Sequence, residues 1–193
     1  EADFKGASGA FRVRHAYGEI GRFLVGMTWS LTNNVGYQPA TVSSDGPVGG
    51  IGLRTPQIRY SQKFNAKFGM SLGIEYSKPQ LLVPENVIAS VVQMLPDLTT
   101  RFTYNSDRLS LRLASAITTI SGRISNNNLQ SLTGYLFTLA GKVSSIKGGD
   151  LFFSVGTGKA TSHFFDTFNG KNNDLVFDPN DEVFEAIAES GGY

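Results

Sequence analysis

The sequence contains no cysteine and has no long run of apolar residues. With no cysteine among its 193 residues, it can form no disulfide framework to support a small fold. No stretch approaches the roughly 20 apolar residues of a membrane-spanning helix. That absence does not exclude a membrane protein, because a strand of a transmembrane barrel needs only about 9–11 residues.

Charge is also sparse and nearly balanced. Lysine and arginine number 17 and aspartate and glutamate 16, so the net charge of +1 predicts no nucleic-acid partner. The two histidines, His15 and His163, lie far apart, and no nucleophile motif, paired metal-ligand spacing or phosphate-binding loop is present. We therefore expect no enzymatic activity, no metal site and no cofactor.

Apolar and polar residues alternate with period two in eight stretches. In the clearest one, Ile58 and Tyr60 alternate with Arg59 and Ser61. Successive side chains of a strand point to opposite faces, so this pattern predicts a sheet with one apolar and one polar, cationic face. We expect strands at about 9–18, 20–31, 54–64, 66–77, 98–105, 107–120, 129–146 and 148–160.

The connections alternate between short and long. Short turns are expected at Gly18-Glu19, at Asn65, at 105–107 and at 147–150. Long outer loops are expected at about 32–53, 78–97 and 121–128, followed by an acidic tail at 161–193. Short turns on one side and long loops on the other are typical of outer-membrane barrels.

We therefore predict an all-β fold, an antiparallel, porin-like transmembrane β-barrel domain or part of one over residues 1–193. The polar rows carry ten cations against one acid, Glu75, and so many cations are hard to pack inside an eight-stranded barrel. We expect the eight strands to belong to a larger barrel, and the start at Glu1 to reflect a processed or partial product. The ten cations are Arg12, Arg14, Arg22, Arg59, Lys63, Lys67, Arg101, Arg108, Arg112 and Lys142.

Two other classes of protein remain open. One is a soluble β-barrel that carries apolar ligands, with its apolar face in a core. Against it, several expected strands alternate for ten or more residues, whereas soluble strands are usually about 5–6 long. The other is an outer-membrane barrel enzyme, for which the sequence offers no convincing nucleophile, histidine and acid.

Several blocks of the sequence resemble the DcaP-like trimeric outer-membrane porins, in the order of that family. They are RVRHAYGE at 12–19, FLVGMTWS at 23–30, DGP at 45–47, RTPQIRY at 54–60, and PDLT at 96–99 leading to Arg101 and Tyr104. The resemblance implies a homotrimer in the lipid bilayer of the bacterial outer membrane. It also implies barrels with about twice the strands found here, which pass small anions such as dicarboxylates. By motif position, Arg14, Arg22 and Arg59 match the family's inner-wall arginines best.

The cationic rows suggest an anion-selective pore. A ring of positive charge in a narrow pore attracts anions, and arginine binds carboxylates through two parallel hydrogen bonds. The alternative is that these arginines pair with acids of an infolded loop, such as Glu85, Asp97 or Asp45, and only stiffen the barrel. The candidate pore-lining residues are Arg12, Arg14, Arg22, Arg59, Lys63, Arg101 and Arg112.

Two segments outside the strands carry further expectations. The apolar stretch at 87–92, in the loop 78–97, is expected to narrow the lumen, to cover a neighbouring subunit or to form a short helix on the rim. Asp178-Pro179 before an apolar run predicts a helix at about 179–189. The acids between 166 and 189 suggest Ca²⁺ binding, but no EF-hand spacing is present and solvated acids are the preferred interpretation.

Overall fold

A computed structural model describes residues 2–5, 10–40, 49–83, 89–124, 129–144, 148–165 and 174–193. Of residues 3–5, 10, 12 and 124 it describes the backbone alone. Among the described residues, no helix is long and apolar enough to cross a membrane.

The described chain is built almost entirely of β-strands. The large sheet has the order β15-β12-β11-β10-β9-β6-β5-β4-β3, with β8 beside the far end of β10. Its strands are β3 (Ala16–Ile20), β4 (Phe23–Trp29), β5 (Arg54–Lys63), β6 (Phe68–Glu75), β8 (Ala89–Val92), β9 (Asp97–Asn105), β10 (Leu109–Ile124), β11 (Leu129–Ser144), β12 (Asp150–Lys159) and β15 (Ala188–Gly192).

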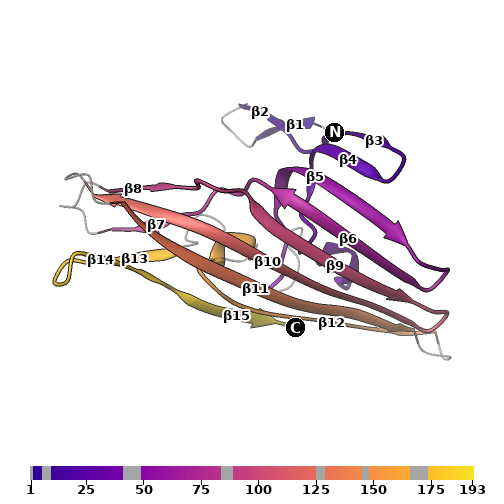
Figure 1. Ribbon diagram of the computed structural model, residues 1–193. Helices are drawn as coiled ribbons and strands as arrows, with labels where there is room; N and C mark the ends of the chain where they lie inside the picture. The colour runs from indigo at the N-terminus through magenta and orange to yellow at the C-terminus, as the bar shows by residue number, and fades with distance from the viewer. Residues whose placement is uncertain are drawn as a thin grey trace.

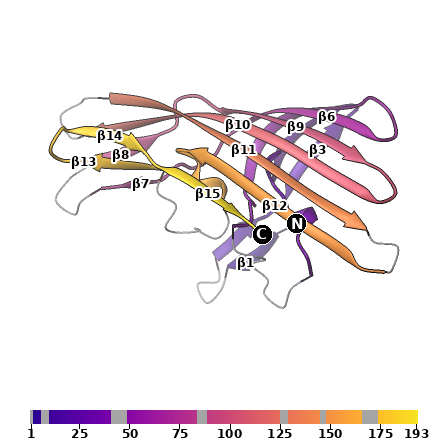
Figure 2. The same cartoon turned by 90° about the horizontal axis from the view of Figure 1, so that it is seen from below.

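Two small sheets accompany the large one. β1 (Ala2–Lys5) pairs with β2 (Ala10–Val13), and β14 (Val183–Ala186), β13 (Leu175–Asp178) and β7 (Leu81–Leu82) form the other. Two single-turn 3₁₀ helices, η2 (Val35–Tyr37) and η3 (Ser162–Phe164), complete the described elements. Figures 1 and 2 show the large sheet as one twisted, curved layer, with β7, β13 and β14 at the end opposite the short turns.

The large sheet exposes its apolar face. Phe23, Leu113 and Phe137 keep 54%, 51% and 55% of their surface exposed, and they belong to the expected apolar rows. The opposite, concave face buries polar residues such as Thr55 and Thr99. The period-two pattern thus predicted β5, β6 and β9 to β12 to within a few residues, and the all-β, antiparallel fold is confirmed.

The N-terminal strands depart from the prediction. The expected strand 9–18 is broken at Arg14-His15 into β2 and β3, and the turn lies at Gly21-Arg22 instead of Gly18-Glu19. Gly21 takes the positive φ of +62° that a tight two-residue hairpin turn requires. The shift places Tyr17 opposite Gly26, so it faces the concave side instead of the apolar row, and it places Glu19, expected in the turn, opposite the buried Leu24 on the concave side as well.

The C-terminal region forms strands where the sequence predicts a helix. Residues 179–182 form a turn, and β14 and β15 follow it. The Asp178 carboxylate accepts a hydrogen bond from the Asn180 N–H at 2.8 Å, so it stabilises this turn instead of a helix. Phe184 packs on Phe177 of β13, with ring centroids 5.3 Å apart, and tertiary packing overrides the local capping signal.

Two apolar clusters lie against the concave face of the sheet. The first joins Ile51, Phe164 and Phe165 to Ala116 and Leu136 of the wall. The second joins Leu175, Phe177 and Phe184 of the small sheet to Ile120 and Ala160. Ala89 and Val91 pack on the second cluster, so the described part of the apolar stretch 87–92 is a strand that leads into this cluster and not a helix.

Candidate functional site

Three of the predicted arginines lie close together on the concave face. Arg59 is on β5, Arg101 on β9 and Arg112 on β10. In the strand pairing, Arg59 lies opposite Gly73 of β6, and Arg101 lies between Ser71 of β6 and Ala114 of β10. Their positions alternate with the exposed apolar row, so the three guanidinium groups point to the same side.

All three arginines bind backbone carbonyl oxygens of Trp29 or of the segment that follows it, residues 30–37, which we call the infolded segment. The Nη2 of Arg59 donates to the carbonyl oxygen of Trp29, the residue before it, at 2.5 Å. Arg101 donates from Nε to Leu31 O at 2.6 Å and from Nη2 to Ser30 O at 2.9 Å. Arg112 donates from Nη1 to the carbonyl oxygen of Asn33.

Glu75 of β6 holds the same segment from the same wall. Its Oε1 accepts hydrogen bonds from the backbone N–H of Leu31 and from Thr99 Oγ1, both at 2.8 Å. Its Oε2 accepts one from Thr55 Oγ1 at 3.0 Å. Glu75 is fully buried, and its hydrogen bonds satisfy both carboxylate oxygens.

The infolded segment reaches across the concave face to the far strands. The Tyr37 hydroxyl lies 2.9 Å from Ser110 Oγ, and the Arg112 guanidinium stacks 4.8 Å from the centre of the Tyr37 ring. Asn34 donates from Nδ2 to Ser154 Oγ of β12 at 3.0 Å. The described part of the loop after β4 therefore lies across the concave face of the sheet.

The arginine cluster carries excess positive charge. Within the described ranges, none of the three guanidinium groups forms a salt bridge with a carboxylate, and their acceptors are carbonyl oxygens and the neutral Gln57 side chain. Glu75 contributes one negative charge near the three positive charges of Arg59, Arg101 and Arg112. Of the acids expected to pair with them, Asp97 hydrogen-bonds to Gln93 instead, and Asp45 and Glu85 lie outside the described residues.

Lys63 and Arg22 lie near the turn end of the same wall. They line an open hollow of about 600 Å³ together with Arg59, Ser61 and Glu19. Lys63 is exposed at the end of β5. Arg22 lies in the β3–β4 turn, not on the wall as predicted, and its Nη1 donates to the hydroxyl of Tyr60, a residue of the outward row, at 3.2 Å.

The other predicted cations lie elsewhere. Arg14 is half-buried between β2 and β3, and the side chain of Arg12 lies outside the described residues. Lys67 and Arg108 are exposed in turns and not on strand faces. Lys142 lies on β11, where its Nζ contacts Asp150 Oδ2 at 2.8 Å.

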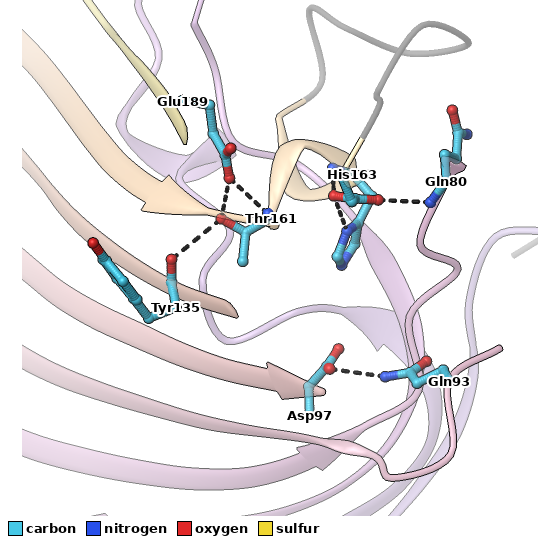
Figure 3. A network of polar contacts seen from close by, with 8 residues as sticks. Gln80, Gln93, Asp97, Tyr135, Thr161, His163 and Glu189 are labelled. Atoms are coloured by element: carbon cyan, nitrogen blue, oxygen red, sulfur yellow. Dashed lines mark hydrogen bonds and ion pairs between the residues drawn. The ribbon is translucent and has the colours of Figure 1, made fainter. Parts of the chain in front are cut away.

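Sequence reasoning missed a buried polar network on the concave side, drawn in Figure 3. His163 Nδ1 lies 2.7 Å from Asp174 Oδ1, and the two side chains are 3% and 0% exposed. Thr161 donates from its backbone N–H to Glu189 Oε1 at 2.6 Å. The sequence expectation of a single inner acid, Glu75, is therefore wrong, since Asp97 is buried there as well.

The His163–Asp174 pair resembles part of a catalytic arrangement, but no nucleophile among the described residues is hydrogen-bonded to the His163 ring. The other ring nitrogen, Nε2, has no hydrogen-bond partner among the described residues. Its burial closes it to a substrate in this conformation. Among the described residues, no three His, Cys, Asp or Glu side chains gather as a metal site, and residues 166–173 of the acidic tail lie outside the description.

The chain was compared with known families, curated proteins and solved structures. No family model matches, and no curated protein matches. The chain is similar in structure to the outer membrane channel DcaP of Acinetobacter baumannii, with a TM-score of 0.80 and 20% identity, over 99% of this chain and 55% of that one. It therefore spans about half the length of that channel. At this identity the likeness establishes the fold, and the structural resemblance to a DcaP channel that the sequence indicated is confirmed.

Proposed function

We propose that this chain forms part of the wall of a channel in the bacterial outer membrane through which small anionic solutes diffuse passively. The observation that carries the proposal is the cluster of Arg59, Arg101 and Arg112, which lies on the concave face without a carboxylate partner among the described residues. The likeness to an outer membrane channel supports the same class of protein.

The exposed apolar face supports a position in the lipid bilayer. Soluble proteins rarely expose a contiguous apolar surface larger than a few hundred Å². Here large apolar side chains are exposed on each of β4, β5, β6, β9, β10 and β11, from Phe23 to Leu139. A soluble carrier of apolar ligands would turn these rows inward, so the observed orientation favours the membrane channel.

The arginines have two roles in this proposal. They fix the infolded segment, and they supply the field that attracts anions. Hydrogen bonds from a cationic donor to a carbonyl oxygen hold the segment but do not neutralise the charge, so the guanidinium groups still act on solutes. The two interpretations of the sequence, selectivity and rigidity, are thus compatible, with carbonyl oxygens in place of the expected acids.

The solute and the assembly follow by analogy. The planar guanidinium group of arginine can bind a carboxylate through two parallel hydrogen bonds, so we propose solutes of the dicarboxylate class. We also propose that the full channel is a homotrimer and that its barrel includes strands beyond those of this chain. No chemical step is part of the proposal.

Single-channel recording tests the proposal. The protein is reconstituted in planar bilayers, and the reversal potential is measured under a KCl gradient. We expect anion preference in the unchanged protein. The triple variant Arg59→Gln, Arg101→Gln, Arg112→Gln should lose most of this preference and gain conductance, because the infolded segment is released. Cation preference in the unchanged protein, or full anion preference in the triple variant, would contradict the proposal.

Lys142→Gln is the matched control for charge. Lys142 is also on the concave face, but its charge is paired with Asp150 at 2.8 Å. Removing it should therefore leave the reversal potential nearly unchanged. A loss as large as that in the triple variant would mean that total charge, and not the unpaired arginine cluster, sets the selectivity.

A further inference from the structure

A cluster of buried polar atoms without hydrogen-bond partners, which we call the pocket, surrounds Asp97 beside the network of Figure 3. It is formed by Ser77, Gln93, Asp97, Thr118 and His163. Asp97 is 0% exposed, Ser77 and Thr118 are each 1%, and His163 is 5%. Each of the five side chains keeps one buried nitrogen or oxygen without a hydrogen-bond partner: Ser77 Oγ, Gln93 Oε1, Asp97 Oδ2, Thr118 Oγ1 and His163 Nε2.

The imidazole of His163 is held rigidly from its other side. Asp174 Oδ1 accepts from Nδ1 at 2.7 Å and from the backbone N–H of His163 at 3.2 Å. Asp174 Oδ2 accepts from the backbone N–H of Gln80 at 2.6 Å. With its proton on Nδ1, the ring presents a lone pair at Nε2, and a carboxylate behind the ring is the usual arrangement of a metal-binding histidine.

The Asp97 carboxylate faces this ring. Its Oδ1 accepts a hydrogen bond from Gln93 Nε2 at 2.8 Å, while Oδ2 has no partner. The hydroxyls of Ser77 and Thr118 lie beside the carboxylate, and His163 lies near enough to act on its charge. Figure 3 shows the free edge of the His163 ring and the Asp97 carboxylate pointing toward one another.

The chemistry of the pocket favours a cation. Three of its free atoms, on Asp97, Gln93 and His163, are acceptors, and the two hydroxyls offer lone pairs as well. A buried carboxylate with no opposite charge bound to it is unfavourable, and a bound cation would supply that charge. A nitrogen ligand mixed with oxygen ligands suits a borderline metal ion such as Zn²⁺ better than Ca²⁺ or Mg²⁺.

We propose that a divalent transition-metal ion binds in this pocket, with His163 Nε2 and Asp97 Oδ2 as its principal ligands. The ion clamps the η3 turn, which carries His163, onto β9 and β10 of the wall. Through Asp174 it also fixes the segments around Gln80 and β13. The proposal concerns the attachment of this region to the wall and does not depend on what the channel conducts.

Equilibrium dialysis of the metal-free full chain against Zn²⁺, followed by elemental analysis, tests the proposal. We expect about one Zn²⁺ per chain and a higher thermal unfolding midpoint with Zn²⁺ than with EDTA. Asp97→Asn, which keeps the shape of the side chain, should lower the affinity more than about ten-fold. His163→Gln should do the same.

Matched controls separate this site from adventitious binding. His15→Gln and Asp107→Asn change the same residue types outside the pocket and should keep the bound Zn²⁺. Absence of bound Zn²⁺ in the unchanged chain would overturn the proposal and would mean that water alone fills the pocket. Undiminished binding in Asp97→Asn would overturn it too, and this variant decides the matter if His163→Gln does not fold.

Discussion

The two halves of the concave face are covered in different ways. Over β5, β6, β9 and the part of β10 around Arg112, the infolded segment and the preceding Trp29 are held by charged side chains that bind their backbone. Over β10, β11 and β12, segments far apart in sequence are held by buried apolar clusters around Phe164 and Phe184. The first half keeps half-buried cations next to open space, whereas the second excludes water. We therefore expect solutes to pass along the arginine half.

Removing a large side chain from the apolar half should have the largest effect on stability. Phe164 is fully buried in the first cluster, so Phe164→Ala should lower the free energy of unfolding by about 3–5 kcal/mol. Denaturant unfolding in detergent measures the change.

The matched control is Phe137→Ala, on the exposed row. Phe137 is 55% exposed, so its loss leaves no cavity inside the protein and should cost much less. Equal losses in the two variants would mean that the apolar clusters do not hold the covering segments in place.

Breaking the polar half should loosen one segment without unfolding the sheet. Arg101 donates two hydrogen bonds to the infolded segment, and each hydrogen bond from a charged donor contributes roughly 1.5–3 kcal/mol. Arg101→Ala should therefore speed amide hydrogen exchange at Leu31 and at Asn34, while exchange within β11 stays unchanged. Unchanged protection at Leu31 would show that the arginines are not what holds the segment.

Glu75→Gln should have a smaller effect on stability and a distinct effect on selectivity. The amide keeps the shape of the side chain but loses one negative charge beside the three arginines, and its NH₂ group no longer accepts hydrogen bonds. We expect a loss of about 1–3 kcal/mol in stability and a stronger anion preference in bilayer recordings. A weaker anion preference would show that solutes do not experience this charge.

The sequence predicted the two faces of the sheet well and the covering of the concave face poorly. Alternation is a local property, and strands such as β5 and β11 carry it over ten or more residues, so their faces could be assigned. The interaction between Glu75 and Leu31 joins residues 44 apart, and no local pattern records it. The sequence therefore predicted the face on which Arg59, Arg101 and Arg112 lie, but not their carbonyl partners.

The wrong predictions have the same origin. The capping signal at Asp178 is present, but the strand that follows pairs with β13 instead of forming a helix. The backbone N–H of Phe184 in that strand donates to Gln130 Oε1, 54 residues away. At the N-terminal end, Gly26 has a positive φ of +132°, and the carbonyl oxygen of Ala16 lies so close to it that a Cβ atom at this position would collide. In this pairing the side chains of β3 point to the face opposite to the one that the alternation predicts. His163 and Asp174 meet only through the packing of η3.

Thiol labelling of single-cysteine variants tests the central claim most directly, namely that the arginine-bearing face borders water and the apolar face borders lipid. The chain has no cysteine, so each introduced thiol reacts without background. Ser61 lies on the concave face and Leu72 on the apolar face. In a bilayer, Ser61→Cys should react with a charged, water-soluble maleimide, and Leu72→Cys only with a lipid-soluble reagent. The reverse pattern would contradict the account.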